Sequence, residues 1–175
     1  RVFEAGMRAA SCMEQHRIAV QATKDAGFVA TSNVALAREL GLVAGGTTGH
    51  EHTQRFFGDR AAFCAVRDRV FGEVTFLLDT YSTLRSGLPV AVSVMKQTPA
   101  RVCSIRFDSE KTMVGDYRHG VAAFRSAGLS APINLGGGFN AAKTREFEAI
   151  RLELDWPRHL QRYMYGQYLV EPHVP

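Results

Sequence analysis

The sequence contains little of several features that would point to particular protein classes. Its 175 residues include only 3 cysteines, 6 prolines and 1 tryptophan. The longest apolar stretches, around residues 75–78 and 88–95, are much shorter than the roughly 18 residues that a membrane-spanning helix needs. The sequence therefore predicts neither a membrane-spanning segment nor a membrane partner.

The three cysteines are too few and too far apart for a disulfide framework. Cys12, Cys64 and Cys103 form an odd set, and no C-x-x-C pair is present. Such a set is typical of buried free thiols in a reducing compartment, and not of a zinc site. We therefore expect buried thiols and a cytoplasmic protein.

Charge of one sign is not concentrated anywhere in the chain. The 21 lysines and arginines exceed the 17 acidic residues by four, and they are scattered along the sequence. Nucleic-acid-binding proteins more often gather basic residues in a stripe with stacking aromatic side chains. We expect no nucleic-acid partner, and the mild basic excess also suits small, phosphate-bearing substrates.

What the sequence does contain is an alternation of strand and helix patterns. Strands are predicted at 42–44, 74–78, 101–107 and 132–135, and helices at 12–26, 34–40, 53–70, 88–96, 114–127 and 140–154. Repeated strand–helix units are typical of a parallel α/β sheet, in which chemistry gathers at the carboxyl ends of the strands. Four strands are about half of an eight-stranded barrel. We therefore expect residues 1–175 to be part of a barrel domain whose remaining strands are absent.

The first candidate site residue is a histidine in a glycine-rich loop. His50 follows Gly46-Thr47-Thr48-Gly49, and His52 stands two positions later. An accessible loop histidine can act as a base or a nucleophile, but it can also simply bond to the backbone. A His-x-His pair can also bind a metal, which would make the protein a metal-dependent hydrolase.

Two further strand ends carry charged residues. Asp79 ends the 74–78 strand, where its carboxylate could orient a ribose hydroxyl, bind magnesium or cap the next helix. Arg106 and Asp108 alternate with Phe107, so both should face the same side of their strand. They could form a structural ion pair or present a guanidinium and a carboxylate to a ligand.

Three consecutive glycines follow the 132–135 strand. Gly136, Gly137 and Gly138 would let backbone N–H groups approach a phosphate, and the next helix would add its dipole. The alternative is a simple turn. The segment is not a complete Walker A loop, because Ala142 stands where a glycine should precede Lys143.

Six segments together resemble the nicotinate phosphoribosyltransferase family, in the family's order and over most of the chain. They are Phe3-Glu4-Ala5-Gly6-Met7-Arg8, Thr31-Ser32-Asn33-Val34, Gly46-Thr47-Thr48-Gly49-His50-Glu51, Leu78-Asp79-Thr80-Tyr81, Ile105-Arg106-Phe107-Asp108-Ser109 and Leu135-Gly136-Gly137-Gly138. The resemblance implies part of an irregular (β/α) barrel of the nicotinate/quinolinate phosphoribosyltransferase kind, without the family's N-terminal domain. It also implies an enzyme that joins nicotinate to phosphoribosyl pyrophosphate, giving nicotinate mononucleotide and pyrophosphate for NAD biosynthesis.

The resemblance also implies a role for each matched residue. His50 would be phosphorylated by ATP, and Asp79 and Asp108 would face the ribose and magnesium-pyrophosphate region, where either could bind Mg²⁺. The substrate contacts would come from Arg8, Thr47, Arg106 and Ser109, and the 5′-phosphate would bind Gly136–Gly138. The family resemblance further implies a homodimer.

The sequence departs from the family pattern at several points. Ala9 replaces the second arginine of the first motif, Glu110 replaces the glycine after Asp108-Ser109, and the later glycine loop is reduced to Tyr165-Gly166-Gln167-Tyr168. These departures leave other functions open: a nicotinamide or quinolinate phosphoribosyltransferase, or a non-catalytic member that serves as an interaction scaffold.

Overall fold

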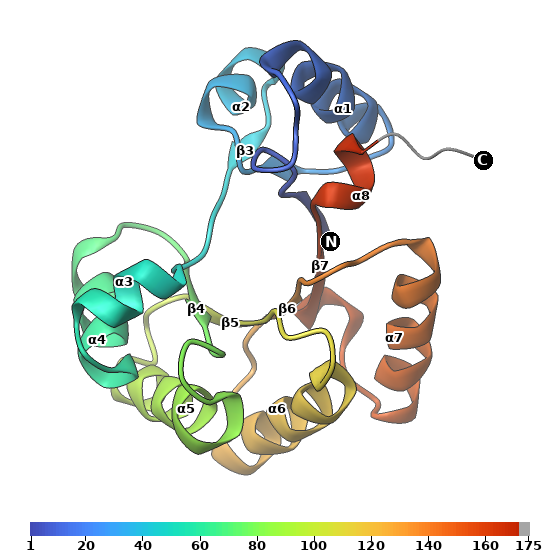
Figure 1. Ribbon diagram of the computed structural model, residues 1–175. Coiled ribbons are helices and arrows are strands. Elements are labelled where there is room, and N and C mark those ends of the chain that lie inside the picture. The colour runs from blue at the N-terminus through green and yellow to red at the C-terminus, as the bar shows by residue number, and fades with distance from the viewer. Residues whose placement is uncertain (172–175) are drawn as a thin grey trace.

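A curled parallel sheet surrounded by helices forms the molecule, as seen in the computed structural model, which describes residues 1–171 (Figure 1). The seven strands pair in the order β3-β2-β1-β7-β6-β5-β4, and every pairing is parallel. Their bounds are β1 Val2–Glu4, β2 Ala30–Thr31, β3 Val43–Ala44, β4 Val74–Leu77, β5 Cys103–Phe107, β6 Ile133–Leu135 and β7 Gln161–Tyr165. The predicted barrel-like α/β fold is confirmed.

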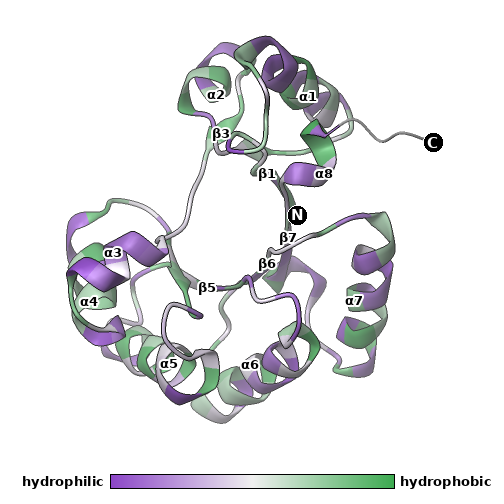
Figure 2. Cartoon of the chain, viewed as in Figure 1, coloured by the Kyte–Doolittle hydropathy of each residue, from purple (hydrophilic) through white to green (hydrophobic). Residues whose placement is uncertain are grey.

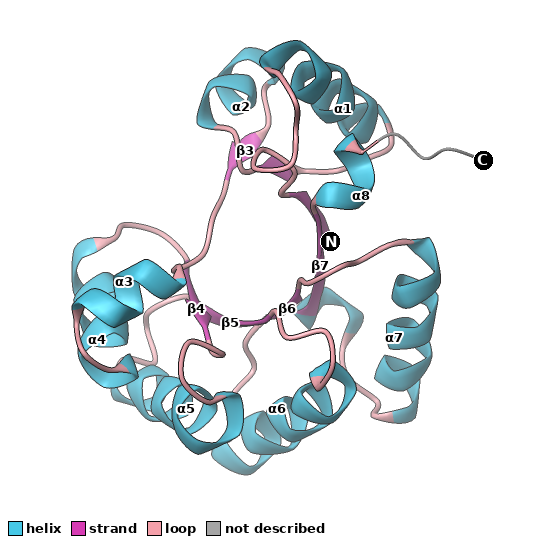
Figure 3. Ribbon diagram, in the orientation of Figure 1, coloured by secondary structure: helices cyan, strands magenta, loops and turns pink. Residues whose placement is uncertain are grey.

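Helices lie around the outside of this sheet (Figure 3). They are α1 Met13–Asp25, α2 Val34–Leu40, α3 His50–Arg55, α4 Asp59–Arg69, α5 Leu88–Gln97, α6 Met113–Ala127, α7 Ala141–Glu153 and α8 Gln167–Val170, with a π-helix at Thr83–Gly87 and a 3₁₀ turn at Arg158–Leu160. Within residues 1–171, no helix is both long enough and apolar enough to cross a membrane.

The predicted number of strands is wrong, because three short strands escaped the sequence patterns. β1, β2 and β7 contain 3, 2 and 5 residues, and their sequences show no long apolar run. They are strands because their neighbours supply the hydrogen-bond partners: β1 pairs with β2 on one side and with β7 on the other. The ends of the described chain thus meet in the middle of the sheet.

The single helix predicted over residues 53–70 is also wrong. The structure has two helices there, α3 and α4, which begin at His50 and Asp59. The break follows from Phe57, whose φ of 56° is left-handed, and from Gly58 behind it. A left-handed residue cannot continue a right-handed helix, so the chain turns before α4 begins.

The segment after β3 crosses the open side of the curled sheet and meets β4 (Figure 1). The Thr48 backbone N–H donates to the Thr75 carbonyl at 2.9 Å, and the Leu77 N–H donates to Thr48 Oγ1 at 2.8 Å. These two bonds connect the two edge strands of the sheet through the loop that carries Thr47 and His50. The ring is therefore closed by a loop on that side, near the carboxyl end of β4.

The main core lies between the β4–β7 strands and the helices α4–α7. Phe76, Ile105, Phe107, Ile133 and Leu135 of these strands are fully or almost fully buried. The helices mix apolar and hydrophilic residues, as the colours of Figure 2 show, and apolar residues of α4–α7 such as Phe63, Val94 and Phe124 are buried in this core. Because the outer faces of the strands supply this core, the inner faces are free to carry polar groups.

An ionised network connects α7 to β7. Tyr163 Oη donates to Glu148 Oε1 at 2.6 Å, and Arg151 Nε donates to Glu148 Oε2 at 3.1 Å. Burial alone would raise the pKa of Glu148, but these two donors outweigh it and hold the pKa below its usual value. Burial and the Glu148 carboxylate raise the pKa of Tyr163.

The cysteines only partly match the prediction of buried thiols. All three are free, as expected, and Cys103 is buried within the core. Cys64 is half-buried, whereas Cys12 is exposed, so the prediction is wrong for Cys12. The reason is its position at the start of α1, where its sulfur accepts the backbone N–H of Gln15 at 3.5 Å.

Candidate active site at the carboxyl ends of the strands

Parallel pairing brings the carboxyl ends of all seven strands to one edge of the sheet. The chain segments that leave this edge, together with Arg106 near the end of β5, carry the site residues that the sequence singled out. A cavity of about 410 Å³ opens there, and its lining includes Arg8, Arg106, Asp108, Glu110 and Gly136–Gly138. The structure thus brings Arg8, Arg106 and Gly136–Gly138 around one space, whereas the predicted substrate contacts Thr47 and Ser109 are not part of its lining.

Arg106 is the centre of this arrangement. Its guanidinium donates to Thr47 Oγ1 at 3.0 Å and pairs with Asp108 Oδ1 at 2.8 Å. The prediction that Arg106 and Asp108 face the same side is confirmed, while Phe107 between them is buried in the core. Arg106 Nε is buried and has no hydrogen-bond partner within residues 1–171. The guanidinium is therefore held in place with its Nε donor still unused.

Asp79 and Ser109 form a second pair beside this cavity. Ser109 Oγ donates to Asp79 Oδ2 at 2.6 Å, while Asp79 Oδ1 is buried and has no hydrogen-bond partner within residues 1–171. The alternative that Asp79 caps the next helix is wrong, because Ser82 Oγ accepts the Arg85 N–H there. Asp79 therefore keeps a carboxylate oxygen for another partner.

The two histidines of the loop point to different neighbours. His50 is exposed at the start of α3, with Nδ1 3.2 Å from Thr80 Oγ1 at the end of β4. His52 Nε2 lies 3.0 Å from the Ala62 carbonyl, and its ring packs against Phe56. In the part of the chain that the structure describes, no three His, Cys, Asp or Glu side chains gather as metal ligands.

The glycine loop after β6 lies against the β5 loop. A side chain at Gly137 would collide with the Asp108 carbonyl, and Gly137 and Gly138 have left-handed φ values of 72° and 63°. Both positions therefore require glycine. Asn140 caps α7 by accepting the Lys143 N–H at 2.9 Å, and Lys143 Nζ donates to the Gly137 carbonyl at 2.7 Å.

A buried network, which the sequence did not predict, holds the loop that carries Arg8. Glu4 Oε1 accepts the Gly6 N–H and lies 3.1 Å from His16 Nε2, and Thr31 donates to the other Glu4 oxygen. Asn33 Nδ2 lies 3.2 Å from His16 Nδ1. Because Asn33 Oδ1 accepts two backbone N–H groups of α2, its Nδ2 must be the donor, so the His16 proton is on Nε2.

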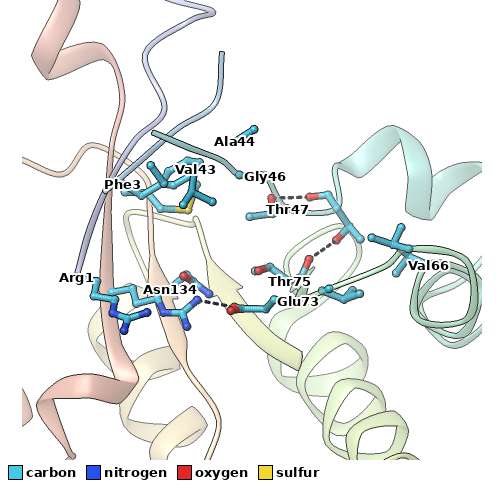
Figure 4. Close-up of a pocket in the computed structure, with 18 of the residues that line it drawn as sticks. Arg1, Phe3, Val43, Ala44, Gly46, Thr47, Val66, Glu73, Thr75 and Asn134 are labelled. Atoms are coloured by element: carbon cyan, nitrogen blue, oxygen red, sulfur yellow. Dashed lines mark hydrogen bonds and ion pairs between the residues drawn. The ribbon is translucent and has the colours of Figure 1, made fainter. Parts of the chain in front are cut away.

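The interior of the curled sheet holds a second, larger cavity of about 780 Å³ (Figure 4). Phe3, Val43 and Val66 contribute apolar walls, whereas Thr75 and Asn134 are polar. Beneath it, Ser104 connects Thr75, Asn134 and Glu73 through hydrogen bonds of 2.7, 3.1 and 2.8 Å, and Arg162 pairs with Glu73. Met164 lines both this cavity and the smaller one, so the two spaces are neighbours.

The sequence missed these polar residues because they are not in a local motif. Glu73 and Arg162 are 89 positions apart and meet only across the closed sheet. The available signal was weak: small polar residues stand at Thr75, Ser104 and Asn134 inside otherwise apolar strands. Alternation marks the inward side of each strand, but it does not predict which strands lie next to each other.

Comparison with curated proteins gives partial sequence matches. Over 109 residues the chain is 35% identical to a nicotinate phosphoribosyltransferase of Bacillus subtilis, which covers 61% of this chain and 22% of that protein. Over 86 residues it is 37% identical to a nicotinate phosphoribosyltransferase of Mycobacterium tuberculosis, covering 48% of this chain and 18% of that protein. The chain thus matches about a fifth of these relatives' length. No family model matches the chain.

Comparison with solved structures supports the fold over nearly the whole chain. A nicotinate phosphoribosyltransferase from Vibrio cholerae superposes with a TM-score of 0.71 at 17% identity, covering 97% of this chain and 42% of that one. A nicotinate-nucleotide pyrophosphorylase from Pyrococcus furiosus superposes with a TM-score of 0.73 at 19% identity and the same two coverages. At these identities the likeness concerns the fold.

Proposed function

Since this chain is related in sequence and fold to part of the nicotinate phosphoribosyltransferases, we propose that it forms the barrel part of an enzyme that joins nicotinate to phosphoribosyl pyrophosphate. The products would be nicotinate mononucleotide and pyrophosphate, as in NAD biosynthesis. The observation that carries the proposal is the Arg106 guanidinium, which is fixed by Thr47 and Asp108 beside the glycine loop.

In this proposal Arg106 binds the carboxylate of nicotinate. A guanidinium donates paired, charge-assisted hydrogen bonds to a carboxylate, and its unused Nε supplies a donor for that purpose. Thr47 and Asp108 hold the guanidinium in one orientation, so little rotamer freedom is lost on binding. Arg8 and Ser109 complete the substrate contacts, and Gly136–Gly138 receive the 5′-phosphate with backbone N–H groups.

In the proposed reaction, the carboxylates of Asp79 and Asp108 assist cleavage of the bond between C1 of the ribose and pyrophosphate. When the C1–pyrophosphate bond lengthens, positive charge grows on the ribose, and carboxylates nearby stabilise it more in the transition state than in the ground state. Asp79 and Asp108 supply these charges at the ends of β4 and β5. Both are already positioned, Asp79 by Ser109 and Asp108 by Arg106.

Magnesium would enter this site bound to the pyrophosphate. Asp79 Oδ1, which is buried without a hydrogen-bond partner within residues 1–171, fits a ligand of such an ion, and Asp108 is the second candidate. When bound, the ion would neutralise charge on the leaving group. ATP would act as the phosphoryl donor to the exposed His50, and a homodimer in the cytoplasm would be the working form.

The first experiment measures pyrophosphate release by the protein with nicotinate and phosphoribosyl pyrophosphate. Arg106→Lys should raise the KM for nicotinate far more than the KM for phosphoribosyl pyrophosphate, because lysine cannot form the paired contact. A loss of about 1.5–3 kcal/mol in nicotinate binding is expected. The control is Arg118→Lys, in a surface pair with Glu153. An unchanged nicotinate KM in Arg106→Lys would refute the assignment.

The second experiment compares the two loop histidines. His50→Ala should abolish ATP-dependent phosphorylation of the protein, whereas His52→Ala should keep it, because His52 faces the Ala62 carbonyl. Equal loss from both changes, together with stoichiometric bound zinc, would favour the metal-dependent hydrolase. Absence of any turnover would favour a non-catalytic scaffold.

A quinolinate phosphoribosyltransferase is the second candidate, and one observation favours it. Arg8 lines the same cavity as Arg106, so two guanidinium groups are available for a ring with two carboxylates. Nicotinate, nicotinamide and quinolinate offered separately to the protein would distinguish the three enzymes. Faster turnover of quinolinate than of nicotinate, lost in Arg8→Ala, would select this candidate.

A further inference from the structure

Glu110 occupies an unusual position for a carboxylate. It follows Ser109 in the loop after β5, and its side chain lies directly against Gly138: a Cβ atom placed on Gly138 would collide with Glu110 Oε1. Both residues line the 410 Å³ cavity. Within residues 1–171 Glu110 makes no hydrogen bond or ion pair, although Arg8 and Arg106 line the same cavity. No hydrogen bond or ion pair in this part of the chain therefore fixes the Glu110 carboxylate against the glycine loop.

The surroundings of this carboxylate suit an anion. Arg8 and Arg106 line the cavity, and Arg106 Nε is buried without a partner. Gly136–Gly138 line the cavity, and Lys143 Nζ is fixed to the Gly137 carbonyl beside them. The Glu110 carboxylate, which lies against this loop, has a negative charge like that of a ligand phosphate and occupies part of the same space.

We propose that Glu110 is an internal competitor that sets the affinity of this cavity for anionic ligands. The Glu110 carboxylate occupies the space directly over Gly138, so a phosphate group that binds there requires the side chain to turn away. Because Glu110 is exposed and unpaired within the described residues, it can rotate towards solvent. The effect is weaker phosphate binding and easier phosphate release, not a blocked site. The inference rests on the proposed function only where it identifies the natural ligand, which would be the 5′-phosphate of the phosphoribosyl group.

The test measures binding of inorganic phosphate to the protein by calorimetry, without any turnover. Glu110→Gln keeps the shape of the side chain and removes its charge, so the Kd for phosphate should fall by on the order of tenfold or more. Glu110→Gly, which also empties the space, should show at least the same gain. The control is Glu146→Gln, an exposed glutamate of α7 with the same charge change. Its Kd should stay within about twofold of the original protein, because Glu146 is not among the residues that line the cavity and solvent screens its more distant charge.

Three results would overturn the proposal. An unchanged or higher Kd in Glu110→Gln would mean that the carboxylate does not compete with phosphate. An equal gain in Glu146→Gln would reduce the effect to net charge. No phosphate binding by any variant would mean that the glycine loop is not an anion site. Because the measurement uses no nicotinate and no turnover, these results are separate from those of the pyrophosphate-release assay.

Discussion

The buried network around His16 allows a quantitative prediction about stability. In His16→Leu the new side chain has nearly the same volume, so the packing changes little, but both hydrogen bonds of the imidazole disappear. His16 is 1% exposed and Glu4 is 0% exposed, so water cannot replace the lost partners. Glu4 keeps the Gly6 N–H and the Thr31 hydroxyl, and Asn33 keeps its two acceptor contacts at α2.

The expected cost is the sum of two losses. The bond from His16 to the Glu4 carboxylate involves a charged acceptor, which contributes roughly 1.5–3 kcal/mol, and the abandoned Asn33 amide N–H costs roughly 1–3 kcal/mol. We therefore expect the free energy of unfolding to fall by about 2.5–6 kcal/mol. This is a large part of the stability of an ordinary domain.

Urea unfolding followed by circular dichroism measures this change. The matched control is His119→Leu, because His119 is exposed on α6 and, within residues 1–171, bonds only to the Gly115 carbonyl of its own helix. The control should change stability by no more than about 0.5 kcal/mol. A loss below about 1 kcal/mol in His16→Leu would refute the reasoning, because it would mean that the Glu4 and Asn33 groups find other partners.

Three further predictions concern packing, pH and thiol chemistry. Gly87→Ala should destabilise the protein by roughly 2–4 kcal/mol in thermal unfolding, because the added Cβ atom would collide with the Leu78 backbone. The control Gly115→Ala should be neutral or slightly stabilising, because a Cβ atom at position 115 meets only open space. The folded-state pKa of Glu148 is lowered, so the ionised carboxylate stabilises the folded protein above the unfolded-state pKa of 4.5, and this stabilisation is lost as the pH falls through the folded-state pKa. In urea unfolding below pH 4.5, the free energy of unfolding should therefore fall less in Glu148→Gln than in the original protein. Burial raises the pKa of Cys103, so iodoacetamide should label the exposed Cys12 first in mass spectrometry, and equal labelling of both in the folded protein would contradict this.

The sequence alone determined the elements that carry local signals. The helix over residues 34–40 was predicted with its observed bounds because an asparagine cap precedes it and a left-handed glycine ends it. The strands β4, β5 and β6 were recognisable as apolar runs, since their residues are buried on the helix-covered side. The glycine loop and the alternation of Arg106 with Asp108 were local for the same reason: neighbouring residues decide both.

Only the tertiary structure decided which distant residues share a site. β1, β2 and β7 are strands because β1 pairs with the other two, and no local pattern specifies that Val2 pairs with Tyr163 at the far end of the chain. The curvature of the sheet brings Thr47 to Arg106, Ser109 to Asp79 and Glu73 to Arg162. It also brings the carboxylate of Glu110, which replaces a glycine of the family motif, against Gly138 of the glycine loop. Sequence spacing gives the direction of a side chain along its own strand, whereas contacts between strands depend on register and closure of the whole sheet.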